Sequence, residues 1–108
     1  MYIEKKMKNP TYHIFFSNLA NPLRIGIISC LKEKERTVSE LCKGLKVEQS
    51  KLSHALANLR ECNLVMFKQR GKERVYSLNK KTMLPILKLI DLHSKNYCKG
   101  KCKGCNGC

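Results

Sequence analysis

Apolar residues recur along most of the chain at the spacing of amphipathic helices. Residues 11–20 are apolar at positions 12, 15, 16 and 19, and residues 23–31 are apolar at positions 23, 27, 28 and 31. Between the two stretches, Asn21 is a favourable helix N-cap and Pro22 suits the first helical position. The pattern therefore predicts two helices, the second of which ends in the charged run K-E-K-E-R.

The middle of the chain predicts two further helices joined by a turn. Thr37 and Glu40 have the spacing of a capping box, in which each side chain accepts a hydrogen bond from the other residue's backbone amide. A short helix follows to about Leu45, and a longer one is expected from residue 48 or 49 to residue 62. The longer helix has one apolar stripe, at positions 52, 55, 56 and 59. Its outer face is small and polar, and carries Gln49, Ser50, Lys51, Ser53, His54 and Asn58.

Two short strands are expected next. Residues 64–69 and 74–78 are rich in β-branched and aromatic side chains. Gly71, in the connection between them, can adopt a positive φ. The tip of the resulting hairpin is strongly cationic, through Arg70, Lys72 and Arg74.

A last helix is expected over roughly residues 82–95. Its leucines and isoleucines lie on more than one face, so it requires a partner surface beyond its own domain. Pro85 is expected in the first turn, where a missing backbone N–H does little harm. Residues 1–96 then form one domain, and residues 97–108 form a cysteine-rich tail.

The charge of the chain points to a polyanionic partner. The 108 residues include 22 basic and 8 acidic side chains, for a net charge of +14. Nucleic acid is the commonest such partner; an acidic membrane surface, an acidic protein, or a lysine-rich surface kept for solubility are the alternatives. No stretch reaches the ~18 apolar residues of a membrane span, and the N-terminus has no apolar secretory core. We therefore expect a cytoplasmic protein with no membrane partner.

The order helix–helix–turn–helix–hairpin–helix is that of a winged helix-turn-helix domain. Four segments carry a closer resemblance: A-N-P-L-R-I-G-I-I-S-C-L, T-V-S-E-L-C, Q-S-K-L-S-H-A-L-A-N-L-R-E-C-N-L-V and R-G-K-E-R-V-Y-S-L. Over about residues 12–95 they resemble the ArsR-type (ArsR/SmtB-like) family of metal-sensing repressors. The resemblance implies a mainly α fold with a small β-hairpin wing, and a homodimer paired through its first and last helices. The chain departs from the family at Glu48, usually a serine cap, and at Lys46, usually the turn glycine.

A helix that lies in the major groove presents its N-terminal residues to the base edges. On this basis Gln49 can form paired hydrogen bonds with adenine, while Ser50 and Ser53 can bond to bases or phosphates. Lys51 and His54 reach phosphates or guanine, and the three wing cations grip the DNA backbone or the minor groove. The expected partner is double-stranded DNA with an inverted-repeat operator. The alternative is a winged helix used only for protein contacts, with its polar face merely solvated.

Two metal sites known in the family are incomplete in this chain. The L-C-x-C pattern before the turn becomes Leu41-Cys42-Lys43-Gly44, which keeps one thiol. The Asp-x-His pattern of the last helix is matched by Asp91 and His93, without the later histidine and acidic residue. Whether Cys42, Asp91 or His93 contributes to a second site stays open. Cys30 and Cys62 lie on or near apolar helical faces and are expected to be small buried hydrophobic residues.

The tail holds four cysteines in the pattern C-x3-C-x2-C-x2-C: Cys98, Cys102, Cys105 and Cys108. In a reducing compartment such a cluster favours metal ligation over disulfides. The consecutive short spacings are those of bacterial ferredoxins in reversed order, and favour a [4Fe–4S] iron–sulfur cluster. Structural zinc usually pairs two C-x2-C units across a longer spacer. Zinc, arsenite or cadmium held by thiolates, or a tail with no defined centre, are the alternatives.

Together these features predict a homodimeric transcriptional repressor whose operator affinity is tuned by the centre on the tail cysteines. We expect neither enzymatic activity nor a small-molecule substrate, because the sequence has no nucleophile–base pair and no phosphate-binding loop. Two rival functions use the same scaffold. One is electron transfer or metal storage, and the other is a subunit of a larger assembly with the tail as a zinc knuckle for protein contacts.

Overall fold

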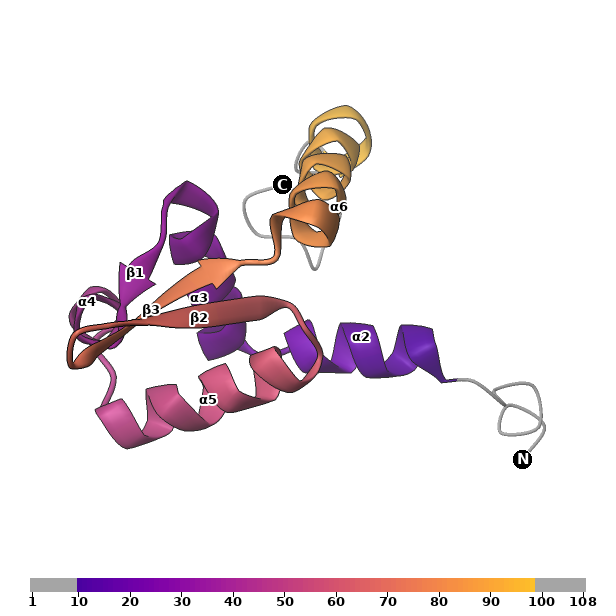
Figure 1. Cartoon of the computed structure of the whole chain (residues 1–108). Helices are drawn as coiled ribbons and strands as arrows, with labels where there is room; N and C mark the ends of the chain where they lie inside the picture. The colour runs from indigo at the N-terminus through magenta and orange to yellow at the C-terminus, as the bar shows by residue number, and fades with distance from the viewer. Residues whose placement is uncertain (1–9, 99–108) are drawn as a thin grey trace. The chain divides into compact units, whose positions relative to one another are not determined.

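The computed structural model describes residues 10–98 of the chain (Figure 1). The chain divides into two compact units, Met1–Leu78 and Asn79–Cys108. The described elements of the first unit are α2 (Thr11–Leu19), α3 (Pro22–Glu33), β1 (Arg36–Thr37), α4 (Val38–Leu45), α5 (Gln49–Glu61), β2 (Val65–Arg70) and β3 (Glu73–Leu78). Those of the second unit are α6 (Lys80–His93) and the π-helical turn η1 (Ser94–Cys98). The division expected at residue 96 stays a prediction.

Two helix starts follow local capping chemistry as predicted. Asn21 accepts hydrogen bonds from the amides of Leu23 at 2.9 Å and Arg24 at 3.2 Å, and thereby starts α3. At the start of α4, the Glu40 amide donates to Thr37 Oγ1 at 3.1 Å and the Thr37 amide donates to Glu40 Oε1 at 2.9 Å. Both arms of the predicted capping box are therefore formed.

The hairpin belongs to a three-stranded antiparallel sheet with the order β1-β3-β2. Strands β2 and β3 pair from Val65↔Leu78 to Arg70↔Glu73, and Gly71 has the predicted positive φ, at 64°. The third strand, β1, was not predicted. It pairs Arg36 with Tyr76 and Thr37 with Val75.

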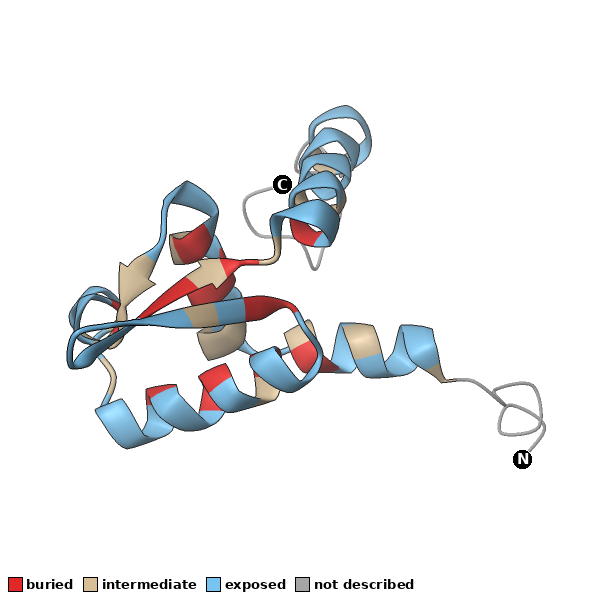
Figure 2. Cartoon of the chain, viewed as in Figure 1, coloured by how far each residue is buried: buried red, intermediate tan, exposed pale blue. Residues whose placement is uncertain are grey.

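The core of the first unit lies between the helices and the sheet. The apolar stripe of α5 is buried as predicted, with Leu52, Ala55, Leu56 and Leu59 at most 4% exposed. Figure 2 shows this buried side of α5 turned toward the hairpin, while its other side is exposed. The rest of the core is formed by buried residues of α3, α4, the sheet and the residue before β2: Ile27, Ile28, Leu31, Leu41, Leu64, Val65, Val75 and Leu78. Truncating one of the buried leucines to alanine would cost about 2–5 kcal/mol.

The last helix begins earlier than predicted. It starts at Lys80 after Asn79, so Pro85 lies inside α6 and the prediction of a first-turn proline is wrong. Proline has no backbone N–H, so the carbonyl of Lys81, four residues earlier, receives no helical hydrogen bond from it. Large apolar side chains of α6 and η1 are exposed: Leu84, Leu89, Ile90, Leu92 and Tyr97.

No single helix among residues 10–98 is both long and apolar enough to cross a membrane. Within the described part of the chain, only α2 and α3 taken as a pair reach the required length and hydropathy, and they are bent by 84° at their junction. One face of α3 is part of the core just described.

Candidate nucleic-acid interface

The outer face of α5 is open to solvent. Its predicted base-reading residues are all exposed: Gln49, Ser50, Lys51, Ser53 and His54. Glu48 precedes the helix in extended conformation and makes no side-chain capping bond, in line with its weak capping chemistry. Asn58 is half-buried, and its backbone carbonyl accepts a hydrogen bond from Asn18 Nδ2 of α2 at 3.5 Å. The predicted base-reading residues that are open to solvent therefore lie in the N-terminal half of α5.

A concave surface lies between α4, α5 and the β2–β3 hairpin, and the hollow that it lines has a volume of about 840 Å³. Four residues of α5, spaced as one helical stripe, form one wall: Gln49, Ser53, Ala57 and Arg60. The hairpin forms the other wall, through Gln69, Lys72, Glu73, Arg74 and Tyr76. Residues of α4 complete the lining: Val38, Ser39, Cys42 and Lys43. The basic lining residues are Lys43, Arg60, Lys72 and Arg74, against the single carboxylate of Glu73.

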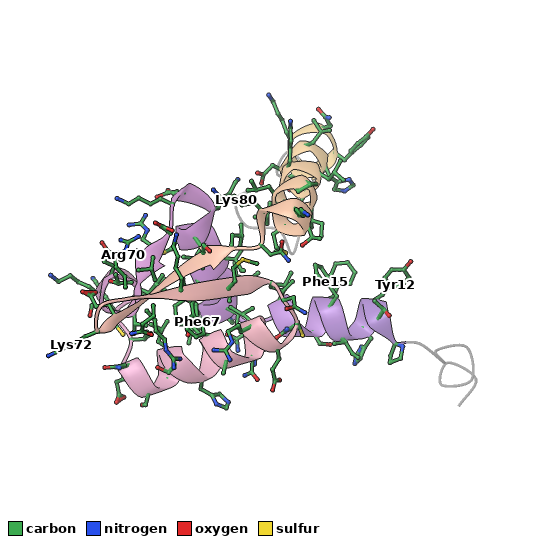
Figure 3. All side chains as sticks on the ribbon, viewed as in Figure 1. Tyr12, Phe15, Phe67, Arg70, Lys72 and Lys80 are labelled. Atoms are coloured by element: carbon green, nitrogen blue, oxygen red, sulfur yellow. The ribbon has the colours of Figure 1, made fainter. Side chains whose placement is uncertain are left out.

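Two arginines meet on one aromatic ring beside this concave surface. The guanidinium carbon of Arg60 lies 4.7 Å from the centroid of the Phe67 ring, and that of Arg74 lies 4.5 Å from it. Phe67 itself packs on Tyr76, with ring centroids 5.3 Å apart. Figure 3 shows Phe67 on the side of the hairpin that faces α5. Arg60 therefore links α5 to the β2–β3 hairpin.

The three predicted wing cations lie in different surroundings. Arg70 forms an exposed ion pair with Glu35, at 3.2 Å, which is worth at most about 1 kcal/mol. Lys72 projects from the hairpin tip (Figure 3). Arg74 is the one held on Phe67. The sheet register separates them further, because Arg70 pairs with Glu73 and lies on the opposite face of the hairpin from Arg74.

Sequence reasoning missed Arg60 and Lys43 as members of this surface. For Arg60 a signal was present, since it continues the helical stripe that starts with Gln49 and Ser53. For Lys43 the sequence carries no comparable signal. Only the packing of α4 against α5 brings Lys43 to the same concave surface.

Comparison with known proteins agrees with this architecture. Residues 21–66 match the arsR family of bacterial regulatory proteins. The arsenical resistance operon repressor of Escherichia coli is 38% identical over 77 residues, which are 70% of this chain and 66% of that protein. The crystal structure of NolR from Sinorhizobium fredii is 31% identical, with a TM-score of 0.73 over 87% of this chain and 91% of that one. The chain belongs to the arsR family.

The winged helix-turn-helix fold is also that of a Mycobacterium bovis DNA-binding domain described as homodimeric. Its TM-score is 0.75 over 89% of this chain and 88% of that one, at 18% identity, so the likeness concerns the fold alone. The chain spans about half to two thirds of the length of the curated relatives it matches.

The cysteines of this arsR-family chain are not gathered in its described part. Cys42 is half-buried on the concave surface and Cys30 is half-buried in α3, and neither forms a disulfide. Cys62 ends α5 and is exposed, so the prediction of a buried hydrophobic residue is wrong there. Cys62 is the C-cap of α5, with φ -92° and ψ 8°, so it does not continue the apolar helical stripe that ends at Leu59.

The candidate metal ligands do not form a cluster within residues 10–98. No three histidine, cysteine or acidic side chains come together over that range. Asp91 and His93 are both exposed on α6, where the His93 ring lies 5.2 Å from that of Tyr97. The predicted tail ligands have side chains outside the described residues: Cys98, Cys102, Cys105 and Cys108.

Proposed function

We propose that this chain is a DNA-binding transcriptional repressor that reads an operator through α5 and its wing. The observation that carries the proposal is the exposed polar face of α5 beside a concave surface with four basic side chains and one acidic one. In this function Gln49 pairs with adenine, and Ser50 and Ser53 bond to bases or phosphates. Lys51, His54 and the wing cations Arg70, Lys72 and Arg74 supply contacts to phosphates, guanine or the minor groove.

The proposal includes a homodimer bound to an inverted repeat. Each of the two helices expected to pair exposes large apolar side chains, with Tyr12 81% and Phe16 61% exposed on α2, and Leu89 64% and Leu92 54% exposed on α6. Large exposed apolar surface on a small chain favours association. Two recognition helices related by a twofold axis bind half-sites about one DNA turn (~34 Å) apart.

The tail would supply the regulatory centre. Four thiolates are a donor set that suits a [4Fe–4S] cluster or a single thiophilic ion such as zinc, cadmium or arsenite. The spacing of the cysteines favours the cluster, and the name of the Escherichia coli relative favours the thiophilic ion. In either case the thiolates hold the centre, and its occupancy shifts the spacing of the two recognition helices. A coupling of about 1–3 kcal/mol would change DNA affinity about 5- to 150-fold.

The DNA-binding part is tested by selecting duplexes from a random library with the full chain, kept reduced and free of oxygen. We expect an enriched inverted repeat with half-sites about one turn apart. Gln49→Ala should relax the preference at one position of each half-site, by about 1–3 kcal/mol of discrimination. Ser29→Ala, on the exposed side of α3, is the control and should leave the preference unchanged. Selection that enriches no sequence would contradict the proposal.

The tail is tested by the metal and sulfide content of protein isolated without oxygen. About four iron and four sulfide per chain, with a brown absorption band, identify the cluster, and one zinc or other thiophilic ion per chain without colour identifies the alternative. A chain that lacks residues 97–108 should still bind the selected duplex but lose any response to the centre. If this deletion abolishes folding, the tail is structural and the regulatory role fails. Metal-loaded protein with no DNA preference would favour storage or electron transfer.

A further inference from the structure

The concave surface between α5 and the hairpin has a geometric counterpart in DNA. Neighbouring major and minor grooves are separated by one sugar–phosphate strand. A recognition helix in the major groove and a wing at the adjacent minor groove must therefore stand on either side of that strand. When α5 occupies the major groove and the hairpin the minor groove, the surface between these two elements faces the DNA backbone. It is the surface lined by Gln49, Ser53 and Arg60 on one side and by Gln69 and Arg74 on the other.

We propose that this surface, here called the phosphate cradle, holds one sugar–phosphate strand of the operator. Arg60 and Arg74, both stacked on the ring of Phe67, bind the phosphates of that strand. The inference rests on the proposed DNA-binding function and deepens it. It assigns a role to Arg60, and makes Phe67 a positioning residue. In this proposal Arg74 does not act with the cations at the hairpin tip. It contacts the DNA strand that lies between the hairpin and α5.

The register of the hairpin directs the right side chains into the cradle. Phe67 pairs with Tyr76 and Gln69 pairs with Arg74, so these four residues lie on one face of the hairpin. Arg74 is the diagonal neighbour of Phe67 on that face, within reach of its ring. Lys68 pairs with Val75 and lies on the other face, although it is adjacent to Phe67 in the sequence.

Stacking on Phe67 prepares both guanidinium groups for an anion. A guanidinium stacked on an aromatic face keeps its N–H edge free, and that edge matches two phosphate oxygens. Arg60 and Arg74 both lie within 5 Å of the same ring centroid, at 4.7 Å and 4.5 Å. Both positive charges are therefore held around one aromatic ring, where they repel each other, and a bound phosphate would offset this repulsion. Because the ring already orders both side chains, less entropy is lost on binding.

A second hollow in the same unit serves as an internal comparison. It measures about 340 Å³ and lies beside α2, α3 and the end of α5. Its charged lining residues are Arg24 and Glu61, one of each sign, together with His13. The cationic excess therefore distinguishes the phosphate cradle from the other hollow, and is not a general consequence of the basic composition.

The first test compares charge variants in equilibrium binding to the duplex selected by the wild-type chain, over a series of salt concentrations. Arg60→Gln should reduce the steepness of log K against log salt by about 1, and lower affinity roughly eightfold at 0.1 M salt. The ranking of the selected duplex over a scrambled one should not change. Lys68→Gln removes the same charge from the other face of the hairpin and should leave the slope unchanged. Arg60→Lys keeps the charge and should keep most of the slope.

The second test separates positioning from charge. Phe67→Leu keeps both arginines, so it should weaken binding several-fold while the salt slope stays near that of the wild-type chain. Thermal unfolding of this variant shows whether it is folded under the binding conditions. An unchanged affinity in folded Phe67→Leu would overturn the positioning role.

The third test uses the cysteines of the unaltered chain. Cys42 lines the phosphate cradle and Cys62 lines the other hollow. With the selected duplex bound, alkylation by N-ethylmaleimide, followed residue by residue by mass spectrometry, should slow at Cys42 far more than at Cys62. Equal rates at Cys42 with and without DNA, or an unchanged slope in Arg60→Gln, would overturn the cradle while the repressor function stands. If the wild-type chain binds no duplex, both the phosphate cradle and the proposed repressor function are wrong.

Discussion

At the scale of single residues, Lys46 adopts a backbone conformation that its side chain disfavours. It ends α4 in the left-handed conformation, at φ 55° and ψ 50°, and its amide donates to the carbonyl of Cys42. The amide of Val47 donates to the same carbonyl at 3.2 Å, which closes the turn toward α5. A non-glycine residue in this conformation costs about 1–2 kcal/mol. The chain keeps the turn of a helix-turn-helix without the glycine that usually makes it.

Lys46→Gly should therefore stabilise the chain, by up to about 1 kcal/mol. Glycine removes the strain of the left-handed conformation, and part of the gain is lost to the greater freedom of glycine in the unfolded chain. Lys46→Val is the opposing control, because a β-branched residue at positive φ should destabilise by at least about 1 kcal/mol. Urea unfolding at fixed protein concentration measures both. A glycine variant no more stable than the wild-type chain would show that the turn is unstrained.

At the scale of elements, the two helices of the helix-turn-helix motif start in different ways. Helix α4 begins with both arms of a capping box, whereas α5 begins after Glu48 with no side-chain cap. An uncapped start leaves amides of the first turn of α5 free to bind an anion such as a phosphate. In α4, the hydrogen bond from the Thr37 backbone amide lowers the pKa of Glu40, helped by the Thr37 hydroxyl and by the nearby Lys34 and Arg36 charges.

This lowered pKa makes the stability of the chain depend on pH through Glu40. Its pKa in the folded chain lies below the ordinary value of 4.5, so the unfolded chain binds the proton more readily. The stabilisation is complete above about pH 4.5 and is lost as pH falls through the folded pKa. The difference in urea midpoint between the wild-type chain and Glu40→Gln should therefore shrink between pH 5 and pH 3.

Thr37→Ala is the control for that pH dependence. It keeps the backbone amide that accounts for the largest part of the lowered pKa, so most of the pH dependence should remain. It removes the hydroxyl cap of α4 and should cost about 1 kcal/mol at every pH. A difference between wild type and Glu40→Gln that is constant down to pH 3 would contradict the role of the Glu40 carboxylate.

At the scale of the whole molecule, charge and apolar surface act on different partners. The net charge of +14 favours a polyanion. The exposed apolar side chains of α2 and α6 do not attract a polyanion, and they favour association with a second copy of the chain. Phe16 is the largest exposed side chain in the middle of α2, where its ring meets Phe15 edge to face at 5.4 Å.

Phe16→Glu should convert a dimer into a monomer, because it places a charge in an apolar contact. Sedimentation equilibrium measures the mass, and affinity for the selected inverted repeat should fall while binding to a single half-site changes little. Ile25→Glu is the matched control. It adds the same charge at an exposed apolar residue of α3, a helix outside the proposed pairing, and should remain dimeric. A monomeric wild-type chain, or a dimeric Phe16→Glu, would contradict this pairing.

Part of the structure was predictable because it depends on residues close together in the chain. The Asn21 cap, the capping box of Thr37 and Glu40, and the positive φ of Gly71 each involve hydrogen bonds or backbone angles within about four residues. The strand β1 could not be predicted in the same way. Two residues have too little pattern of their own, and they become a strand only by pairing with β3, about 40 residues later.

In the candidate site, too, the features that depend on local sequence were predictable and those that depend on tertiary contacts were not. The exposed polar face of α5 was predictable, because helical periodicity alone assigns Gln49, Ser50 and Ser53 to the side opposite the apolar stripe. The exposure of Cys62 was not, because the cover of a helix end depends on its spatial neighbours. Pro85 lies inside α6 because the helix starts at Lys80, and the sequence placed that start two residues late.

The sequence by itself determined most of the helices, the hairpin, the apolar stripe of α5 and the cationic character of the chain, since these follow from local backbone chemistry and composition. Only the tertiary structure decided that Arg60 of α5 and Arg74 of β3 share the ring of Phe67. It also decided that Lys43 and Cys42 join the same concave surface. The physical reason is that such contacts are set by the packing of the helices against the sheet. Helix packing is a property of the whole core, and no short segment encodes it.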